Sequence, residues 1–183
     1  MKDSRAAILD FWFVETRPAQ WFQKNPDFDA LIRERFGADY DLGIAGIYDS
    51  WAGEADGCLA LCILFDQFPR NMFRETARAF ATDERALDVA ERALAARFDA
   101  LLSVQKRRFL YLPFEHAEDL AHQDRSVALF EAMQKEDPTG YAYALRHRDV
   151  IARFGRFPHR NAALGRGSTP DEVAYLAGPD AGF

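Results

Sequence analysis

The sequence has little cysteine and no long apolar segment. Only two cysteines occur in 183 residues, too few for the disulfide scaffold of a small secreted protein. The longest uninterrupted apolar run, Cys58 to Phe65, is far shorter than the roughly 20 residues that a membrane helix needs. Asp10 interrupts the short apolar run near the N-terminus, which argues against a signal peptide. We therefore expect a cytoplasmic protein that does not engage a membrane.

Several familiar catalytic signatures are also missing. There is no glycine-rich phosphate loop, no Gly-x-Ser-x-Gly nucleophile elbow and no motif for a redox cofactor. The formal net charge is −6, which argues against a nucleic-acid partner. From these absences we expect no nucleic-acid partner and assign no cofactor.

Strand signals are absent too, because no segment alternates apolar and polar residues and no hairpin turn separates β-rich runs. Helix signals are frequent. Asn25-Pro26 and Asp137-Pro138 each combine an N-cap residue with proline at the first helical position. Thr169 to Glu172 forms a capping box, and Gly37 and Gly155 are candidate C-caps.

These signals predict an all-α protein, with residues 1–183 forming a single domain of roughly eight to ten helices. Short connections favour antiparallel helix pairs, stacked either as an α-α superhelix or as an irregular bundle. Pro69 and Pro113 are predicted to end their helices, because proline disfavours helical backbone at the residue before it. The next helix is expected to begin near Phe114 or Ala117.

One segment is strongly basic. Between Tyr141 and Gly167 six arginines face a single acid, so this stretch carries +5 within a chain of −6. Pro113 to Asp137, just upstream, contains seven acids and two bases. The two segments either pair with each other or form opposite walls of a polar cleft.

The densest polar stretch runs from Arg153 to Asn161, on a turn that Gly155 and Pro158 shape. Guanidinium groups presented on a turn can grip a carboxylate or phosphate through two parallel hydrogen bonds. The alternative is that they secure helix ends by bonding carbonyl oxygens. The candidate ligand-binding residues here are Arg153, Arg156, Arg160 and Asn161.

Two further stretches offer polar groups. Arg70 and Asn71 follow a predicted helix end and could add contacts to the ligand, or could simply form a helix-terminating turn. Cys58 and Cys62 are spaced as buried thiols on an apolar helix face.

The histidines are the candidates for proton transfer, because their pKa lies near neutrality. His116 and His159 are the predicted acid–base groups, with Glu115 or Asp119 orienting the imidazole. If one helix carried Glu115, Asp119 and His122 they would share a face, but this spacing matches no strong metal signature and we assign no metal. His147 lies in an apolar stripe on its helix and is interpreted as a core residue in preference to a catalyst.

Seven blocks of the chain, in order, resemble the bacterial domain of unknown function 924 family, whose fold is described as tetratricopeptide-like. Val14 and Ala117 depart from the glycine and serine expected at those positions. The resemblance implies stacked antiparallel helix pairs and supplies no established reaction. The blocks are Leu9-Asp10-Phe11-Trp12-Phe13, Trp21-Phe22, Asp66-Gln67-Phe68-Pro69-Arg70-Asn71, Arg78-Ala79-Phe80-Ala81 with Asp83, Pro113-Phe114-Glu115-His116 with Glu118-Asp119, Arg153 to Asn161, and Ser168-Thr169-Pro170 with Glu172.

Three functions are compatible with these residues. The leading hypothesis is a polar pocket that binds a small anionic ligand, with hydrolysis as the first reaction to test. The second is a non-catalytic module that captures an acidic peptide or a protein C-terminus in a helical groove. The third is that the arginines only lock helix ends. Exposure of the guanidinium groups discriminates between these hypotheses.

Overall fold

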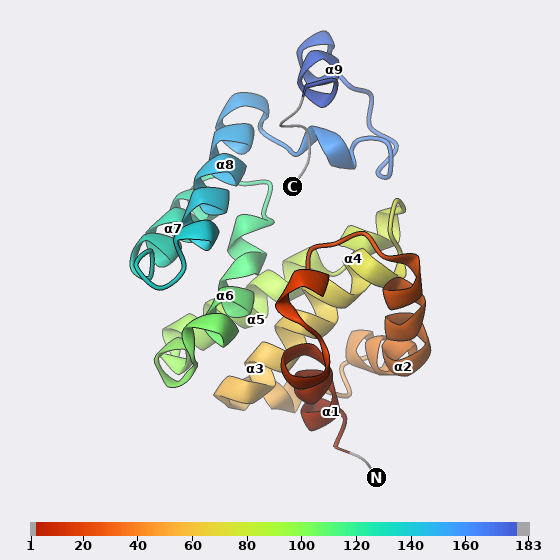
Figure 1. Cartoon of the computed structure of the whole chain (residues 1–183), viewed down its shortest axis with the longest axis vertical. Coiled ribbons are helices and arrows are strands. Elements are labelled where there is room, and N and C mark those ends of the chain that lie inside the picture. The colour runs from red at the N-terminus through yellow and green to blue at the C-terminus, as the bar shows by residue number, and fades with distance from the viewer. Residues whose placement is uncertain (1–2, 179–183) are drawn as a thin grey trace. The chain divides into compact units, whose positions relative to one another are not determined.

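The computed structural model describes residues 3–178, which form helices and no strand (Figure 1). The predicted all-α fold is therefore confirmed over this range. The chain packs as two compact units. Unit 1 comprises the described residues up to Arg74 together with Arg78–Pro113, and unit 2 comprises Glu75–Ala77 and the described residues from Phe114 onward. Within residues 3–178, none of the helices combines the length and the apolar character that a membrane crossing demands.

Unit 1 is built around an aromatic core. Phe109 lies with its ring 4.8 Å from Trp21 and 5.6 Å from both Trp12 and Phe13, measured between centroids. Edge-on arrangements dominate these contacts, as the quadrupoles of aromatic rings prefer. The helices of unit 1 are α1 (Ser4–Asp10), α2 (Pro26–Ile44), α3 (Ala55–Cys62), α4 (Phe68–Met72), α5 (Asp83–Ala95) and most of α6 (Val104–Glu115).

Helix α2 begins as predicted, with the Asn25 side chain accepting hydrogen bonds from backbone amides of the first turn. The prediction that Gly37 ends it is wrong, because α2 continues to Ile44. Tyr40 and Gly43 lie beyond Gly37 and are both buried. Gly43 packs so closely that a Cβ atom there would lie 2.9 Å from the side chain of Leu64. Packing beyond Gly37 thus outweighs the roughly 1 kcal/mol that glycine costs inside a helix.

Neither Pro69 nor Pro113 ends its helix, contrary to prediction. A π-helical turn, Ile63–Gln67, joins α3 to α4, and the Phe68 amide bonds the Ile63 carbonyl five residues back. Pro69 then lies in the first turn of α4, where a missing amide proton costs little. Helix α6 likewise runs past Pro113 to Glu115. Glu115 is therefore the end of α6 and not the start of the following helix.

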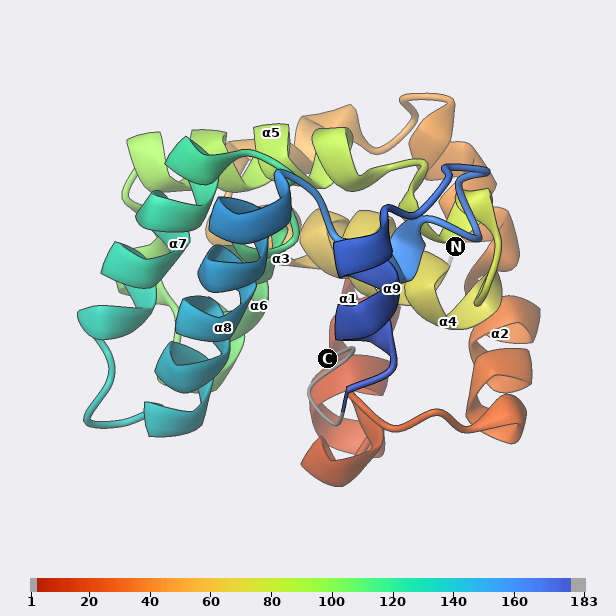
Figure 2. The ribbon, with the colours of Figure 1, turned by 90° about the horizontal axis from the view of Figure 1, so that it is seen from above.

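Unit 2 contains α7 (Leu120–Glu131), α8 (Pro138–Phe154) and α9 (Pro170–Leu176). α7 and α8 lie side by side along their length and are joined by a short turn (Figure 2). The predicted start of α8 at Asp137-Pro138 and its left-handed cap at Gly155, with φ of 69°, are both confirmed. The capping box at Thr169 is confirmed as well. Val150, Ile151 and Phe157 form an apolar core against which Phe154 and Tyr175 pack.

Candidate functional site

A buried polar cluster lies where the end of α6 meets the middle of α8. Glu115 Oε1 is 3.3 Å from His147 Nδ1, and the rings of His116 and His147 are 6.1 Å apart. One donor atom of each of these three residues lies within 4.8 Å of the other two. Glu115 and His147 are buried and His116 is half-buried. We call these three residues the Glu–His cluster. Within residues 3–178, they form the group of side chains that could hold a metal ion.

His147 is held in one neutral form. Its Nδ1 lies 2.9 Å from the Tyr143 carbonyl oxygen, which can only accept, so Nδ1 carries the proton and Nε2 presents a lone pair. Burial is the main cause that lowers the pKa of His147 to about 2, with smaller contributions in the same direction from His116, His159 and Arg160. The imidazole is therefore neutral at physiological pH. The prediction that His147 is a buried residue is confirmed. The sequence did not predict its contact with Glu115.

The loop between α6 and α7 is secured by the side chain of Gln123, which is fully buried in α7. Its amide nitrogen donates to the carbonyl oxygens of Glu115 and Ala117, at 2.6 and 2.8 Å, and more weakly to that of Phe114 at 3.4 Å. These bonds satisfy carbonyls that the end of α6 leaves without helical partners. Gln123 thereby holds the backbone that presents Glu115 and His116.

Arg160 secures the same loop from the other side. It is buried, its guanidinium donates to the His116 carbonyl at 2.9 Å, and it stacks 4.6 Å over the Phe157 ring. The Phe157 ring also packs against the His147 ring at 5.6 Å. Arg160 therefore brings a positive charge close to the Glu–His cluster and fixes the backbone at His116.

A bidentate ion pair fixes the turn after α8. Both carboxylate oxygens of Glu118 accept from Arg166, at 2.6 and 2.9 Å, and Oε1 also accepts from the Phe157 amide. Burial alone would raise the pKa of Glu118, but these hydrogen bonds outweigh it and the pKa is lowered. Glu118 and Arg166 come from the acidic and basic segments of the sequence. Ion pairing between the two segments therefore neutralises part of their opposite charges.

A second bidentate pair joins the same turn to α9. Arg156 donates to both oxygens of Glu172, at 2.7 and 2.8 Å, and to the Gly167 carbonyl. The Thr169 amide and Asn161 also donate to Glu172. The Arg156 and Thr169 bonds hold the pKa of Glu172 at about 2. Arg156 is thus an anchor for α9 as well as a predicted ligand contact.

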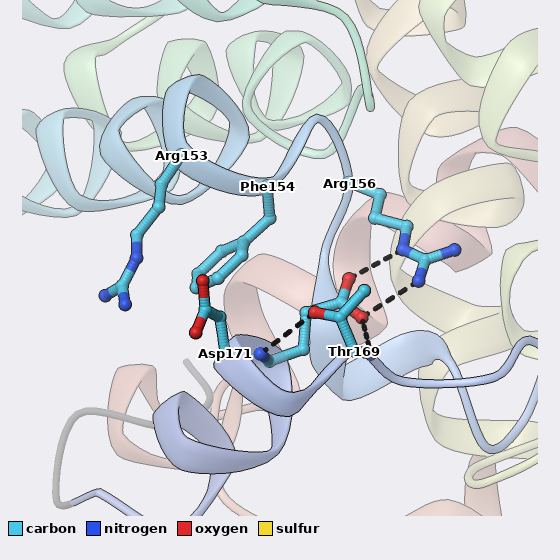
Figure 3. A pocket seen from close by; sticks show the side chains of 6 residues that line it. Arg153, Phe154, Arg156, Thr169 and Asp171 are labelled. Atoms are coloured by element: carbon cyan, nitrogen blue, oxygen red, sulfur yellow. Dashed lines mark hydrogen bonds and ion pairs between the residues drawn. The ribbon is translucent and has the colours of Figure 1, made fainter.

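An open hollow of about 420 Å³ lies between the end of α8 and the start of α9 (Figure 3). Arg153 extends along one side of it, and Phe154 and Asp171 project between Arg153 and the Arg156–Glu172 pair (Figure 3). Arg153 is exposed and stacks on the adjacent Phe154 ring at 4.6 Å. The residues that line it are Arg153, Phe154, Arg156, Thr169, Asp171 and Glu172. We call it the Arg153 hollow.

The remaining predicted site residues have local partners. Arg70 and Asn71 belong to unit 1, where Arg70 pairs with Asp83 at 2.7 and 2.9 Å and Asn71 donates to the Gln67 carbonyl. The other predicted site residues all belong to unit 2. Their assignment as ligand contacts stays a prediction.

Asp119 and His159 lie at the edges of unit 2. Asp119 is the N-cap of α7, and its carboxylate lies 2.9 Å from the His122 ring nitrogen. The conditional prediction that Glu115, Asp119 and His122 share one helix face fails, because α6 ends at Glu115 and α7 begins at Leu120. His159 is exposed, and its ring lies 5.6 Å from Phe157.

Sequence reasoning missed the positions that hold the loop together. No sequence signal marks Gln123, which stands between the polar residues His122 and Asp124. The apolar stripe on its helix predicts that His147 is a core residue, but spacing within one helix cannot reveal a carboxylate on another. Glu172 forms the capping box that the sequence predicts. Its ion pair with Arg156 is not predictable from the sequence, because it depends on the turn that brings the two side chains together.

The fold and site define a class of all-α protein in which a helical unit encloses a buried carboxylate–imidazole cluster. The chain belongs to the DUF924 family of bacterial proteins of unknown function, which it matches over residues 8–180. It is similar to the solved structure of a protein of unknown function from Agrobacterium tumefaciens. That chain is 42% identical, with a TM-score of 0.89, and the match covers 94% of this chain and 96% of the other. No curated protein matches the sequence.

Proposed function

We propose that the protein binds a small ligand bearing a carboxylate or phosphate group in the Arg153 hollow. One observation carries this proposal. Arg153 lines the hollow, and its guanidinium forms no ion pair or hydrogen bond with any residue of the described range 3–178. An exposed guanidinium of this kind keeps all its donors available for two parallel hydrogen bonds to an anion.

The charges around the hollow narrow the ligand class. Arg156 is already neutralised by Glu172, while Asp171 opposes the charge of Arg153. A multiply charged anion therefore gains less here than a ligand with one anionic group. A group that can also donate to Asp171, such as an amine, fits this lining better still.

Binding is proposed without a chemical step. Neither the residues of the Glu–His cluster nor His159 line the hollow, so the geometry does not couple the ligand to His116 or His159. Hydrolysis with His116 as acid–base and Glu115 orienting it stays a prediction. It is tested by turnover of any ligand found, in the wild type and in His116→Ala.

The second candidate is capture of a peptide C-terminus by the same groups. The hollow is open on one side, which supports this candidate because a peptide chain could leave the site freely. Arg153 would bind the terminal carboxylate and Phe154 would contact an apolar side chain. A short peptide with a free C-terminus should then bind, and the same peptide with an amidated C-terminus should not.

Thermal unfolding in the presence of acetate, citrate, inorganic phosphate and the two peptides tests the proposal. A ligand at 100 times its Kd stabilises the folded state by about 2.7 kcal/mol, which raises the Tm by several degrees. We expect at least one probe to raise the Tm of the wild type, and Arg153→Ala to abolish the rise.

The matched control is Arg146→Ala, which removes an exposed arginine of the same helix that does not line the hollow. The control is needed because phosphate also stabilises proteins by exclusion from their surface. Equal shifts in the wild type and Arg153→Ala would refute the proposal, as would the absence of any shift in the wild type.

A further inference from the structure

The Glu–His cluster presents the donor set of a transition-metal site. Two imidazoles and one carboxylate are the ligands of many catalytic zinc sites and of non-haem iron sites. In residues 3–178, Glu115, His116 and His147 form the set of metal-binding side chains whose donor atoms all lie within 4.8 Å of one another. They come from the end of α6, the loop after it and the middle of α8. Glu115 and His116 are neighbours in sequence, and the packing of α8 brings His147 to them.

We propose that Glu115, His116 and His147 bind a divalent transition metal ion, with Zn²⁺ the best match to this donor set. The proposal goes beyond the ligand site and uses none of the residues of the Arg153 hollow. Donor atoms around a tetrahedral zinc ion are about 3.3 Å apart, given metal–ligand bonds of about 2.0–2.1 Å. The donor atoms of the cluster lie within 4.8 Å of one another, so binding requires the side chains to close by at most about 1.5 Å.

The protonation state of His147 suits a ligand. Its Nδ1 lies 2.9 Å from the Tyr143 carbonyl oxygen and 3.3 Å from Glu115 Oε1, and both oxygens can accept the Nδ1 proton. The nitrogen left with a lone pair to bind the metal is therefore Nε2. Metal-binding histidines commonly donate their other ring N–H to a carbonyl or carboxylate, since this fixes the ring and makes the ligating nitrogen more basic. The Phe157 ring also holds the imidazole in place, because the two rings pack edge to face with their centroids 5.6 Å apart.

A second observation comes from Gln123. Its amide nitrogen bonds the Glu115 carbonyl at 2.6 Å, while its buried amide oxygen finds no hydrogen-bond donor in the described part of the chain. Buried amide oxygens are normally satisfied by protein or ordered water. Three protein ligands leave a coordination position open, and water in that position would be a donor of the kind that this oxygen requires.

The charge balance also favours a partly open site. As a metal ligand Glu115 would contribute one negative charge, and Arg160, whose guanidinium donates to the His116 carbonyl at 2.9 Å, places a positive charge beside the site. A divalent ion beside Arg160 therefore leaves net positive charge. An anion, or hydroxide derived from bound water, is the ligand expected to complete the coordination.

Isothermal titration of the full-length, chelator-treated protein with Zn²⁺ tests the proposal. Absorption spectra with Co²⁺ report the coordination without any enzymatic assay. We expect one strong site in the wild type. Removing a direct ligand should weaken it by at least about 100-fold, the upper end of what loss of an outer partner costs. The informative variants are His116→Ala and Glu115→Gln, because His116 is half-buried and glutamine preserves the shape of glutamate.

The matched control is His122→Ala, which removes another histidine of unit 2, one paired with Asp119 at 2.9 Å. Its zinc affinity should equal that of the wild type. Circular dichroism of each variant separates lost folding from lost binding. The proposal fails if the wild type binds no Zn²⁺, or if His116→Ala and Glu115→Gln bind it as well as the wild type does. Loss of binding in His122→Ala alone would overturn the proposal and identify the Asp119–His122 pair as the site. Arg153→Ala should retain zinc binding, which separates this result from the ligand proposal.

Discussion

At the scale of single residues, the role of each arginine follows from its neighbours. Arg156 and Arg166 are each matched by a buried or half-buried carboxylate, so their charge is largely used inside unit 2. Arg160 bonds a carbonyl and stacks on a ring. Arg153 keeps its guanidinium exposed at the hollow. The four arginines of this basic segment therefore have different roles, as ion-pair partners, as a carbonyl donor and as an exposed cation. Composition alone cannot distinguish these roles.

The Arg156–Glu172 pair predicts a specific dependence of stability on pH. The pKa of Glu172 is about 2 in the folded protein against an ordinary 4.5, so its charged form stabilises the fold. This contribution is complete above pH 4.5 and is lost as pH falls towards 2. Glu172→Gln should be less stable than the wild type at pH 7, and the difference should vanish in acid. Urea unfolding across this pH range measures it.

The neighbouring acid supplies the control. Asp171→Asn changes an exposed carboxylate that lines the hollow but forms no hydrogen bond within residues 3–178. Its difference from the wild type should stay small at every pH. A stability loss in Glu172→Gln that is the same at pH 7 and pH 3 would show that the carboxylate charge is not responsible.

At the scale of helices, packing determines whether a glycine or proline ends a helix. Gly155 ends α8 because it takes a left-handed conformation that other residues adopt at a cost. Gly37 has the same chemistry but lies inside α2, and Pro69 lies inside a helical stretch that a π-helical turn readjusts. Caps with hydrogen-bonding side chains, such as Asn25 and Asp137, were predictable because they act through neighbours in sequence.

The two glycines give opposite predictions for the same substitution. A Cβ at Gly37 would meet no atom within 4 Å, so Gly37→Ala should stabilise the protein by about 0.5–1 kcal/mol. A Cβ at Gly155 is equally unobstructed, but φ is +69°, and Gly155→Ala should cost about 1 kcal/mol. Urea unfolding of both variants checks the signs. Changes of the same sign in both would contradict the assignment of Gly37 to a helix interior and Gly155 to a left-handed cap.

At the scale of the whole molecule, each unit has its own apolar centre. All three tryptophans, Trp12, Trp21 and Trp51, belong to unit 1, whose aromatic core surrounds Phe109. The Glu–His cluster belongs to unit 2, beside the core formed by Val150, Ile151 and Phe157. Tryptophan fluorescence therefore reports on unit 1, and bound metal would report on unit 2.

Phe109 is the test of the larger core. It is 1% exposed and contacts four aromatic rings, so Phe109→Ala should lower the free energy of unfolding by about 3–5 kcal/mol. Denaturant unfolding followed by tryptophan fluorescence measures it. Phe22→Ala is the control, because Phe22 stacks on Phe109 but is 59% exposed, and its loss should cost much less. Equal losses would mean that Phe109 does not organise this core.

Local sequence patterns predict the helical class, the stretch in which the polar groups lie, and the caps at Asn25, Asp137, Gly155 and Thr169. These features depend on residues within a few positions of one another, which sequence shows directly. The folded structure was needed to show that α2 continues past Gly37 and that α6 continues past Pro113. It was also needed to show that Glu115 lies next to His147. Those outcomes depend on burial and on pairing between separate helices. Whether an arginine is exposed or neutralised is settled in the same way, by a carboxylate that the folded chain brings to it.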